Sequence, residues 1–447
     1  MTQPSRLSST RCALTASAAW LIFFHFARHI SYGGDDSVVL VPLFGGGLAE
    51  SLGRFLRPLE YLIALWSAQV DAPLWLGVSA LAYIAMCMTT LSLLCLVNDN
   101  AKPPMWQIVV CAVTPLAAQP YFQIDTVSQA LANAFSLGYV LVSLRAMHSV
   151  TPDELRRHCW RMVTLALLCI LSKETTYGIV FLGALLLLFR HRTRAAMQAA
   201  CIVGLLVAAV LWRVLYQYGD VAVDSGFGFK LNPLYWVFSF VFSVIVAASP
   251  LPTAITLSGA YASHPALLAI VALGLLVVGI GLLAYRRSPA LIWRAARQSN
   301  LLDLGNVHFL LGLYLLASVV PTVFFKAAEL YASQLLPLLK VLLLTIPVAS
   351  PVLARVFWSA YSTLWMLASV INIMYYSVAT GYDPQGRILY APISAAVASA
   401  PRIYSIYHRG IYADDTYPDT ASSCILSRRT PGICLPRDIS SGYPKSR

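Results

Sequence analysis

The chain has 447 residues, of which 31 are Lys or Arg and 19 are Asp or Glu, so its formal net charge is +12. Charged residues make up only 11% of the chain and apolar residues 58%, and the mean hydropathy is +0.70. A soluble domain usually contains about 25% charged residues. Soluble enzymes, nucleic-acid-binding proteins and disordered scaffolds are therefore excluded. The composition indicates an all-α polytopic membrane protein.

Apolar segments recur along the chain at the length of a membrane-spanning helix, which needs about 20 residues, or fewer where neighbouring protein shields it. We predict about 11 transmembrane helices. They lie near residues 13–32, 74–97, 104–119, 127–147, 161–172, 176–189, 197–217, 266–285, 306–325, 335–355 and 358–378. The first of them is interpreted as an uncleaved anchor, because its apolar run continues through Phe23, Phe24 and Phe26 without a small-residue cleavage site.

The loops carry an uneven distribution of Arg, which predicts the orientation of the chain. Three basic clusters lie in loops that we place in the cytoplasm: Arg156, Arg157 and Arg161; Arg190, Arg192 and Arg194; and Arg286, Arg287, Arg294 and Arg297. The N-terminus is then cytoplasmic. A further apolar stretch, 233–249, would move the last basic cluster outside if it were a full span. We therefore interpret residues 228–262 as a re-entrant or interfacial segment.

Two regions are expected from the change in composition. Residues 1–379 form the transmembrane domain, and residues 380–447 form a short loop-rich tail on the outer, periplasmic side. Cys424 and Cys434 lie in this tail, where an oxidising compartment would allow them to form a disulfide. Two free thiols are the alternative.

The first outer loop contains the adjacent carboxylates Asp35 and Asp36 directly after a span. Two adjacent carboxylates repel each other, so they favour a metal ion, a basic partner or a hydroxyl proton nearby. A solvated turn in which Asp caps the next helix is the alternative. The following residues, 47–57, have the spacing of an amphipathic interfacial helix, and Pro58 is expected to start the next helix.

Further charged residues are predicted on the same outer face. Arg54 and Arg57 suit phosphate binding or snorkelling, and Glu60 follows them closely. Asp125 suits either a site or a helix cap, and Lys173 with Glu174 joins two short helices at a depth where an ion pair is costly. The late outer loop contributes Lys326 and Glu329. Lys340 lies within a span and requires a partner that the sequence does not identify.

The order of these motifs resembles the GT-C superfamily of integral membrane glycosyltransferases, and in particular the protein O-mannosyltransferase and aminoarabinose transferase group. The resemblance rests on the outer Asp35-Asp36 pair, Arg-Pro-Leu-Glu at 57–60, Ser-Lys-Glu at 172–174 and Glu-x-Tyr at 329–331. It covers about residues 10–345. The chain lacks a large C-terminal soluble domain with a Trp-Trp-Asp motif, which argues against the oligosaccharyltransferase branch.

The resemblance implies roles for these residues. Asp35 or Asp36 would be the general base on an acceptor hydroxyl, with Asp125 and Glu60 supporting the acceptor or a metal. Arg54, Arg57, Lys173, Glu174, Lys326 and Glu329 would bind the phosphate and sugar of a polyprenyl-phosphate-linked donor. Some members of the superfamily use a divalent cation, so Mg²⁺ or Mn²⁺ at Asp35, Asp36 and Asp125 is an alternative to a base.

The chemistry of sugar transfer agrees with such a set. It needs a carboxylate to take the acceptor proton and cations to stabilise the departing phosphate. The resemblance implies transfer of a sugar to an acceptor glycan, lipid or protein at the periplasmic face of a bacterial inner membrane, with inversion at the anomeric carbon if the transfer is a single displacement. The expected partners are the lipid-linked donor and membrane lipids, without nucleic acid. A polysaccharide polymerase or ligase, and a secondary transporter or lipid flippase, are the alternatives.

Overall fold

The computed structural model describes most of the chain as a bundle of helices. It describes residues 3–27, 57–70, 74–113, 121–122, 127–217, 232–248, 265–286, 306–324, 333–334, 336–346, 348 and 350–379. Within these ranges it contains helices and no strands. The all-α class that the composition predicts is therefore confirmed.

The first half of the chain contributes seven α-helices and one 3₁₀ turn within the described ranges. They are α1 (Arg6–Ala27), α4 (Pro58–Val70), α5 (Leu74–Asn98), α6 (Met105–Ala112), α8 (Val127–Met147), α9 (Pro152–Ser172), the 3₁₀ turn η2 (Glu174–Thr176) and α10 (Tyr177–His191). The second half contains η3 (Arg192–Ala195), α11 (Ala196–Gln217), α12 (Pro233–Ala248), α14 (Pro265–Tyr285), α16 (Val307–Phe324), α18 (Leu336–Thr345) and α19 (Pro351–Ala379).

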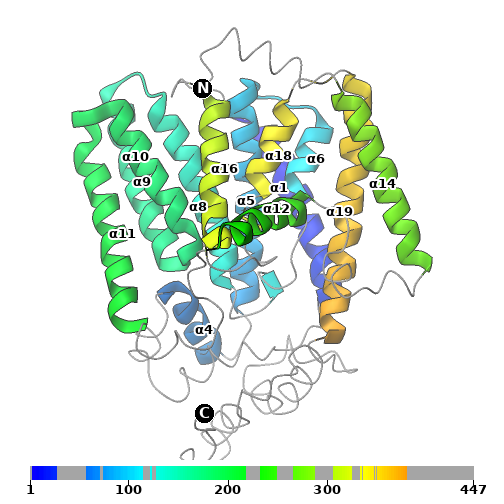
Figure 1. Ribbon diagram of the computed structural model, residues 1–447, viewed down its shortest axis with the longest axis horizontal. Helices are drawn as coiled ribbons and strands as arrows, with labels where there is room; N and C mark the ends of the chain where they lie inside the picture. Colours follow the sequence, from blue (N-terminus) through cyan, green and yellow to red (C-terminus); the bar gives the residue numbers. More distant parts are fainter. Residues whose placement is uncertain are drawn as a thin grey trace, which may run out of the picture.

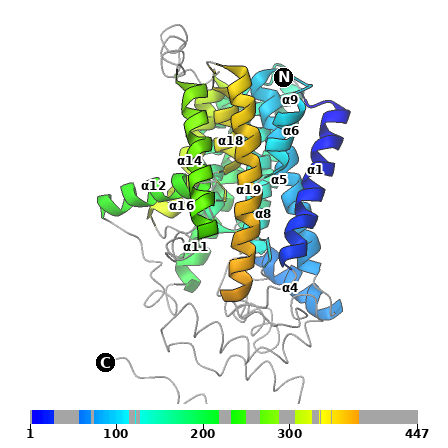
Figure 2. The same ribbon diagram turned by 90° about the vertical axis from the view of Figure 1, so that its right-hand side faces the viewer.

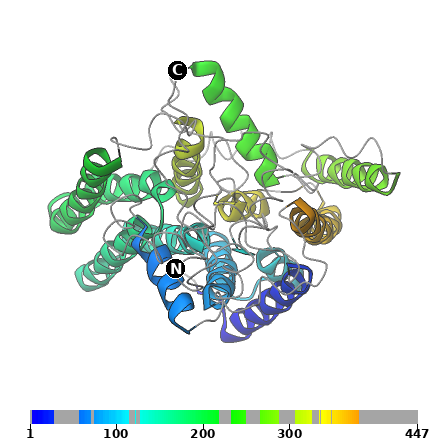
Figure 3. The same ribbon diagram turned by 90° about the horizontal axis from the view of Figure 1, so that it is seen from below.

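Most of these helices run along one common direction, with α11 and α14 at opposite margins of the bundle (Figures 1 and 3). Four segments of the described chain are apolar and long enough to cross a membrane: Arg6–Ala27, Leu74–Asn98, Val127–Met147 and Glu174–Trp212, the last of which includes α10 and most of α11. The chain is therefore described here as a membrane protein. Helix α12 instead lies across the bundle direction (Figures 1 and 2), an orientation that suits an interfacial or re-entrant segment.

Several helix boundaries differ from the sequence prediction, and for two of the predicted spans the local sequence gives the reason. The predicted span 161–172 is the second half of α9, which begins at Pro152 because the Thr151 side chain caps it, accepting a hydrogen bond from the Glu154 backbone N–H at 3.3 Å. The predicted span 335–355 is wrong as a single helix. Helix α18 ends at Thr345 and α19 begins at Pro351, where proline is well tolerated in the first turn.

Lys340 is buried in α18 and uses the end of another helix as its partner. Its Nζ donates hydrogen bonds to the carbonyl oxygens of Val110 at 2.8 Å and Val113 at 2.6 Å, and it lies 4.7 Å from the centroid of the Trp365 ring. Helix α6 ends at Ala112 and leaves carbonyl groups without helical partners, which an ammonium group satisfies well. The partner that the sequence could not identify is thus a helix C-terminus.

An aromatic cluster fixes residues 121–122 against the first helices. The Trp20 ring of α1 stacks on Phe122 with centroids 5.0 Å apart, and Tyr83 of α5 contacts both Trp20 at 5.7 Å and Tyr121 at 5.9 Å. Aromatic pairs in these arrangements add to the stabilisation from buried area. The cluster therefore positions the Tyr121 hydroxyl, which takes part in the site described below.

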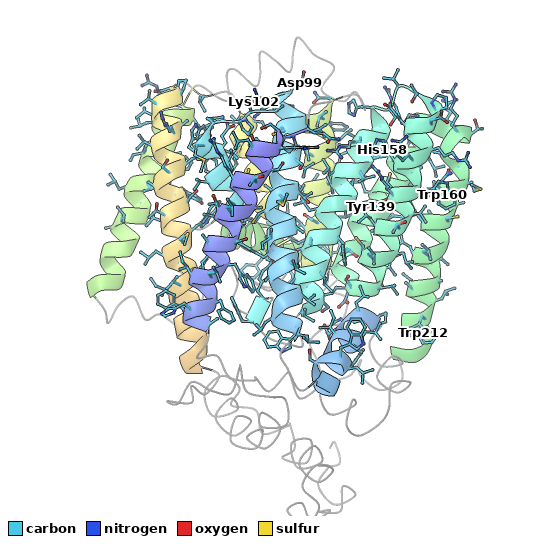
Figure 4. The ribbon with its side chains drawn as sticks, turned by 180° about the vertical axis from the view of Figure 1, so that it is seen from behind. Asp99, Lys102, Tyr139, His158, Trp160 and Trp212 are labelled. Atoms are coloured by element: carbon cyan, nitrogen blue, oxygen red, sulfur yellow. The ribbon has the colours of Figure 1, made fainter. Side chains whose placement is uncertain are left out.

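Helices α8 and α10 approach each other closely at Gly183. The Tyr139 side chain (Figure 4) crosses from α8 and donates a hydrogen bond to the Val180 carbonyl oxygen of α10 at 2.9 Å. A β-carbon on Gly183 would overlap the Tyr139 ring, whereas a β-carbon on Gly204 in α11 would meet nothing within 4 Å.

We predict that Gly183→Ala destabilises the protein by about 1–3 kcal/mol, because the Tyr139 ring has to move. Gly204→Ala is the matched control, and it should be neutral or stabilise by up to about 1 kcal/mol through higher helix propensity. Unfolding of the two purified variants in detergent measures both effects. Equal stability of the two would contradict the close contact between α8 and α10.

Candidate functional site

Charged side chains lie toward the two ends of the bundle, and the two ends differ. Asp99 and Lys102 lie at one end of the bundle (Figure 4). Helix α1 begins at the same end with Arg6, because the backbone N–H of the preceding Ser5 donates a hydrogen bond to the Ala101 carbonyl oxygen at 2.8 Å. The same end carries the basic residues that lie near the starts of α9 and α19, at the ends of α10 and α14, and in η3: Arg156, Arg157, Arg190, Arg192, Arg194, Arg286 and Arg355. The opposite end contains α4 (Figure 1).

Four of the predicted site residues meet at the α4 end: Arg57, Glu60, Lys173 and Glu174. We name these four residues the charged cluster. Arg57 forms a two-point ion pair with Glu174, with Nη2 2.8 Å from Oε1 and Nε 3.3 Å from Oε2. The two residues are 117 positions apart in the sequence. The pair therefore joins the start of α4 to the connection between α9 and α10.

The local backbone explains how each segment presents its charges. Pro58 occupies the first position of α4, as the sequence predicts, and the Arg57 carbonyl oxygen accepts hydrogen bonds from the backbone N–H groups of Glu60 and Tyr61. Lys173 has extended backbone angles, φ −161° and ψ 146°, which end α9 and start η2. The charges therefore project from a helix start and a helix break rather than from a continuous helix.

Glu60 and Lys173 are both almost fully buried, each with 2% of its surface exposed. Oε2 of Glu60 accepts no hydrogen bond of normal geometry within the described part of the chain. Burial raises the pKa of Glu60, while the positive charges of Arg57 and Lys173 and the nearby Ser128 hydroxyl oppose the rise. Helix α4 has 13 residues, too few to span a bilayer, so this carboxyl group belongs to the end of the bundle.

A group of uncharged polar residues adjoins the charged cluster. Helix α8 contributes Gln129 and Asn133, which lie four residues apart on one face, and η2 contributes Thr175. The sequence analysis did not single out these residues. The signal available was two amide side chains one turn apart in an apolar span, where polar groups are costly.

Several predicted residues lie outside the described ranges. These are Asp35, Asp36, Arg54, Asp125, Lys326, Glu329, Cys424 and Cys434. Their roles as base, metal ligands, donor-binding groups and disulfide stay predictions. Within the described residues, no group of three or more His, Cys, Asp or Glu side chains is arranged to hold a metal ion.

The sequence matches no protein-family model and no curated protein.

We predict that Glu60→Gln becomes increasingly stabilising, relative to the wild type, as the pH rises from the ordinary pKa of Glu, 4.5, through the raised pKa of Glu60 in the folded state. Because burial raises the pKa of Glu60 in the folded state, its neutral form favours folding at low pH. That contribution is lost as the pH rises through the folded-state pKa. Thermal unfolding at several pH values measures the difference in Tm.

The matched control for this prediction is Leu59→Met, on the same helix, which changes no titratable group. Its difference in Tm from the wild type should not vary with pH. A Glu60→Gln difference that is equally flat with pH would contradict the buried, shifted carboxyl group.

Proposed function

We propose that the protein is an integral membrane glycosyltransferase of GT-C type that transfers a sugar from a polyprenyl-phosphate-linked donor to an acceptor hydroxyl. The observation that carries the proposal is the charged cluster, in which two cations and two carboxylates from distant segments meet at one end of an apolar bundle. Such a combination suits a reaction that needs a proton acceptor beside a phosphate leaving group.

The cations of the cluster suit the phosphate of the donor. Glu174 orients the Arg57 guanidinium, which suits phosphate by its planar geometry, and Lys173 adds a buried ammonium. Negative charge accumulates on the phosphate as it departs, and cations in a site of low dielectric constant stabilise that charge strongly. Arg54 and Lys326 are proposed to add to this group from the neighbouring loops.

The reaction is a single displacement. The acceptor oxygen forms a bond to the anomeric carbon while the bond between that carbon and the phosphate oxygen breaks. The bonding electrons leave with polyprenyl phosphate, and the acceptor proton goes to a carboxylate. We assign that role to Asp35 or Asp36, and we assign Glu60 to supporting the acceptor. Inversion at the anomeric carbon follows from a single displacement.

The distribution of charge supports an orientation. The end that carries the Arg-rich helix termini is proposed to face the cytoplasm, together with the N-terminus. The charged cluster then lies on the periplasmic side of a bacterial inner membrane. The helices that run along the bundle alternate in direction (Figure 1), in keeping with about 11 spans once α12 is treated as interfacial.

A secondary transporter or lipid flippase is the second candidate. The observation that favours it is the C-terminus of α6, which ends at Lys340 inside the bundle, because transporters often place interrupted helices at their binding sites. Lys340 is occupied there by two backbone carbonyl groups and a Trp ring, which suits a structural role. The charged cluster therefore remains the better candidate for the substrate site.

The decisive experiment measures polyprenyl phosphate released from a polyprenyl-phosphate sugar by the purified protein in lipid nanodiscs. Lys173→Met should lower kcat/KM by about 100-fold, because a buried cation at the leaving group is lost. Arg192→Gln, at the opposite end of the bundle, is the control and should retain wild-type turnover. Full turnover by Lys173→Met would refute the proposed role, and transport of intact donor across vesicles without release would favour the transporter.

The base is tested separately, because the two candidate aspartates are adjacent. Asp35→Asn and Asp36→Asn should differ, with the variant that lacks the base losing most of its turnover. Full turnover in both variants would remove the base assignment.

A further inference from the structure

Beside the charged cluster lies a second polar cluster without charges. It consists of Gln129 and Asn133 of α8, Thr175 of η2, and Ser333 and Gln334 of the segment before α18; we name it the amide cluster. Gln129, Asn133, Thr175 and Gln334 have exposed fractions of 0%, 1%, 2% and 3%. Thr175 directly follows Glu174, so the two clusters are continuous.

Hydrogen bonds within the amide cluster hold its members in place. The Gln129 Nε2 group donates to Asn133 Oδ1 at 2.9 Å, and the Asn133 Nδ2 group donates to Ser333 Oγ at 2.9 Å and to the Tyr121 hydroxyl at 3.3 Å. The Thr175 hydroxyl donates to Gln129 Oε1 at 3.5 Å. The amide groups of Gln129 and Asn133 therefore already have partners at both their oxygen and nitrogen atoms.

Gln334 differs from the other two amides. Neither its Oε1 nor its Nε2 atom has a hydrogen-bond partner in the described part of the chain, although the side chain is 3% exposed. Buried polar atoms in native proteins nearly always have partners, because leaving them unsatisfied costs stability. We therefore expect the carboxamide of Gln334 to form its hydrogen bonds with a bound ligand.

The chemistry of a carboxamide restricts what that ligand can be. An amide offers one acceptor and two donor hydrogens, so it is best matched by a group that both donates and accepts. A sugar hydroxyl does both, whereas the oxygens of an ionised phosphate only accept. The charged cluster and the amide cluster thus match the two parts of one molecule, a phosphate with an attached sugar.

We propose that Gln334 binds hydroxyl groups of the donor sugar while the charged cluster binds the adjacent phosphate. The hydrogen bond between Asn133 and Ser333 holds the segment that contains Gln334 against α8, and Gln129 of the same helix accepts a hydrogen bond from Thr175, the neighbour of Glu174. The assignment rests on the proposed function and adds to it the residue that recognises the sugar.

The test compares the binding of two lipids to the protein in nanodiscs, polyprenyl-phosphate sugar and bare polyprenyl phosphate. The wild type should bind the sugar-bearing lipid more tightly. Gln334→Met should reduce that preference by about tenfold and leave the Kd of bare polyprenyl phosphate unchanged. The Tm of Gln334→Met should be equal to or higher than that of the wild type, because the amide has no partner in the protein to lose.

Gln198→Met is the matched control, because Gln198 is also buried but lies near the start of α11, at the opposite end of the bundle. It should retain the full preference for the sugar-bearing lipid. If Gln334→Met also retains it, or loses stability and affinity for both lipids together, the sugar-binding role is overturned. If the wild type binds neither lipid, the proposed function itself fails, which is a distinguishable result.

Discussion

The ion pair between Arg57 and Glu174 is the interaction on which the site depends. It joins the start of α4 to the break between α9 and α10 with two hydrogen bonds. Removing charged groups from water is costly unless opposite charges and hydrogen bonds compensate them. The pair places positive and negative charge beside the buried Glu60 and Lys173, so that four ionisable side chains share one environment at the end of an apolar bundle. Without the ion pair, no hydrogen bond between charged side chains would join the start of α4 to the connection between α9 and α10 in the described structure.

The cost of burying a charge also explains the surroundings of Lys340. Comparing Lys340 with Glu60 distinguishes a buried charge that stabilises the fold from one that suits a ligand site. Lys340 is fully buried, yet two carbonyl groups of α6 and the Trp365 ring surround its ammonium. Its hydrogen bonds go to groups that a helix end must satisfy in any case. Glu60 has an oxygen without such a partner, and so does the amide of Gln334. Unsatisfied groups near the charged cluster, and not burial as such, mark the region that suits a ligand.

The sequence was sufficient to predict the class of the fold and much of its helical content. Long apolar segments predict α5 and α8 to within one residue, because lipid imposes a minimum length on each helix. The start of α9 was missed because apolar length alone was considered, although Thr151 and Glu154 carry a capping signal. The meeting of Arg57 with Glu174 could be expected only from a resemblance, since the residues are 117 positions apart. Gln334 was missed because a single amide carries no charge and no motif, and Gln129 and Asn133 were missed because only charged residues were considered, although two amides one turn apart in an apolar span are a signal.

A double-mutant cycle on Arg57 and Glu174 tests the central claim most directly. It measures the free energy of unfolding of Arg57→Gln, Glu174→Gln and the double variant in the same detergent. The ion pair predicts a coupling energy of about 1 kcal/mol, so that the second substitution costs much less once the first has been made. Strictly additive effects of the two substitutions would show that the segments do not interact, and would contradict the charged cluster.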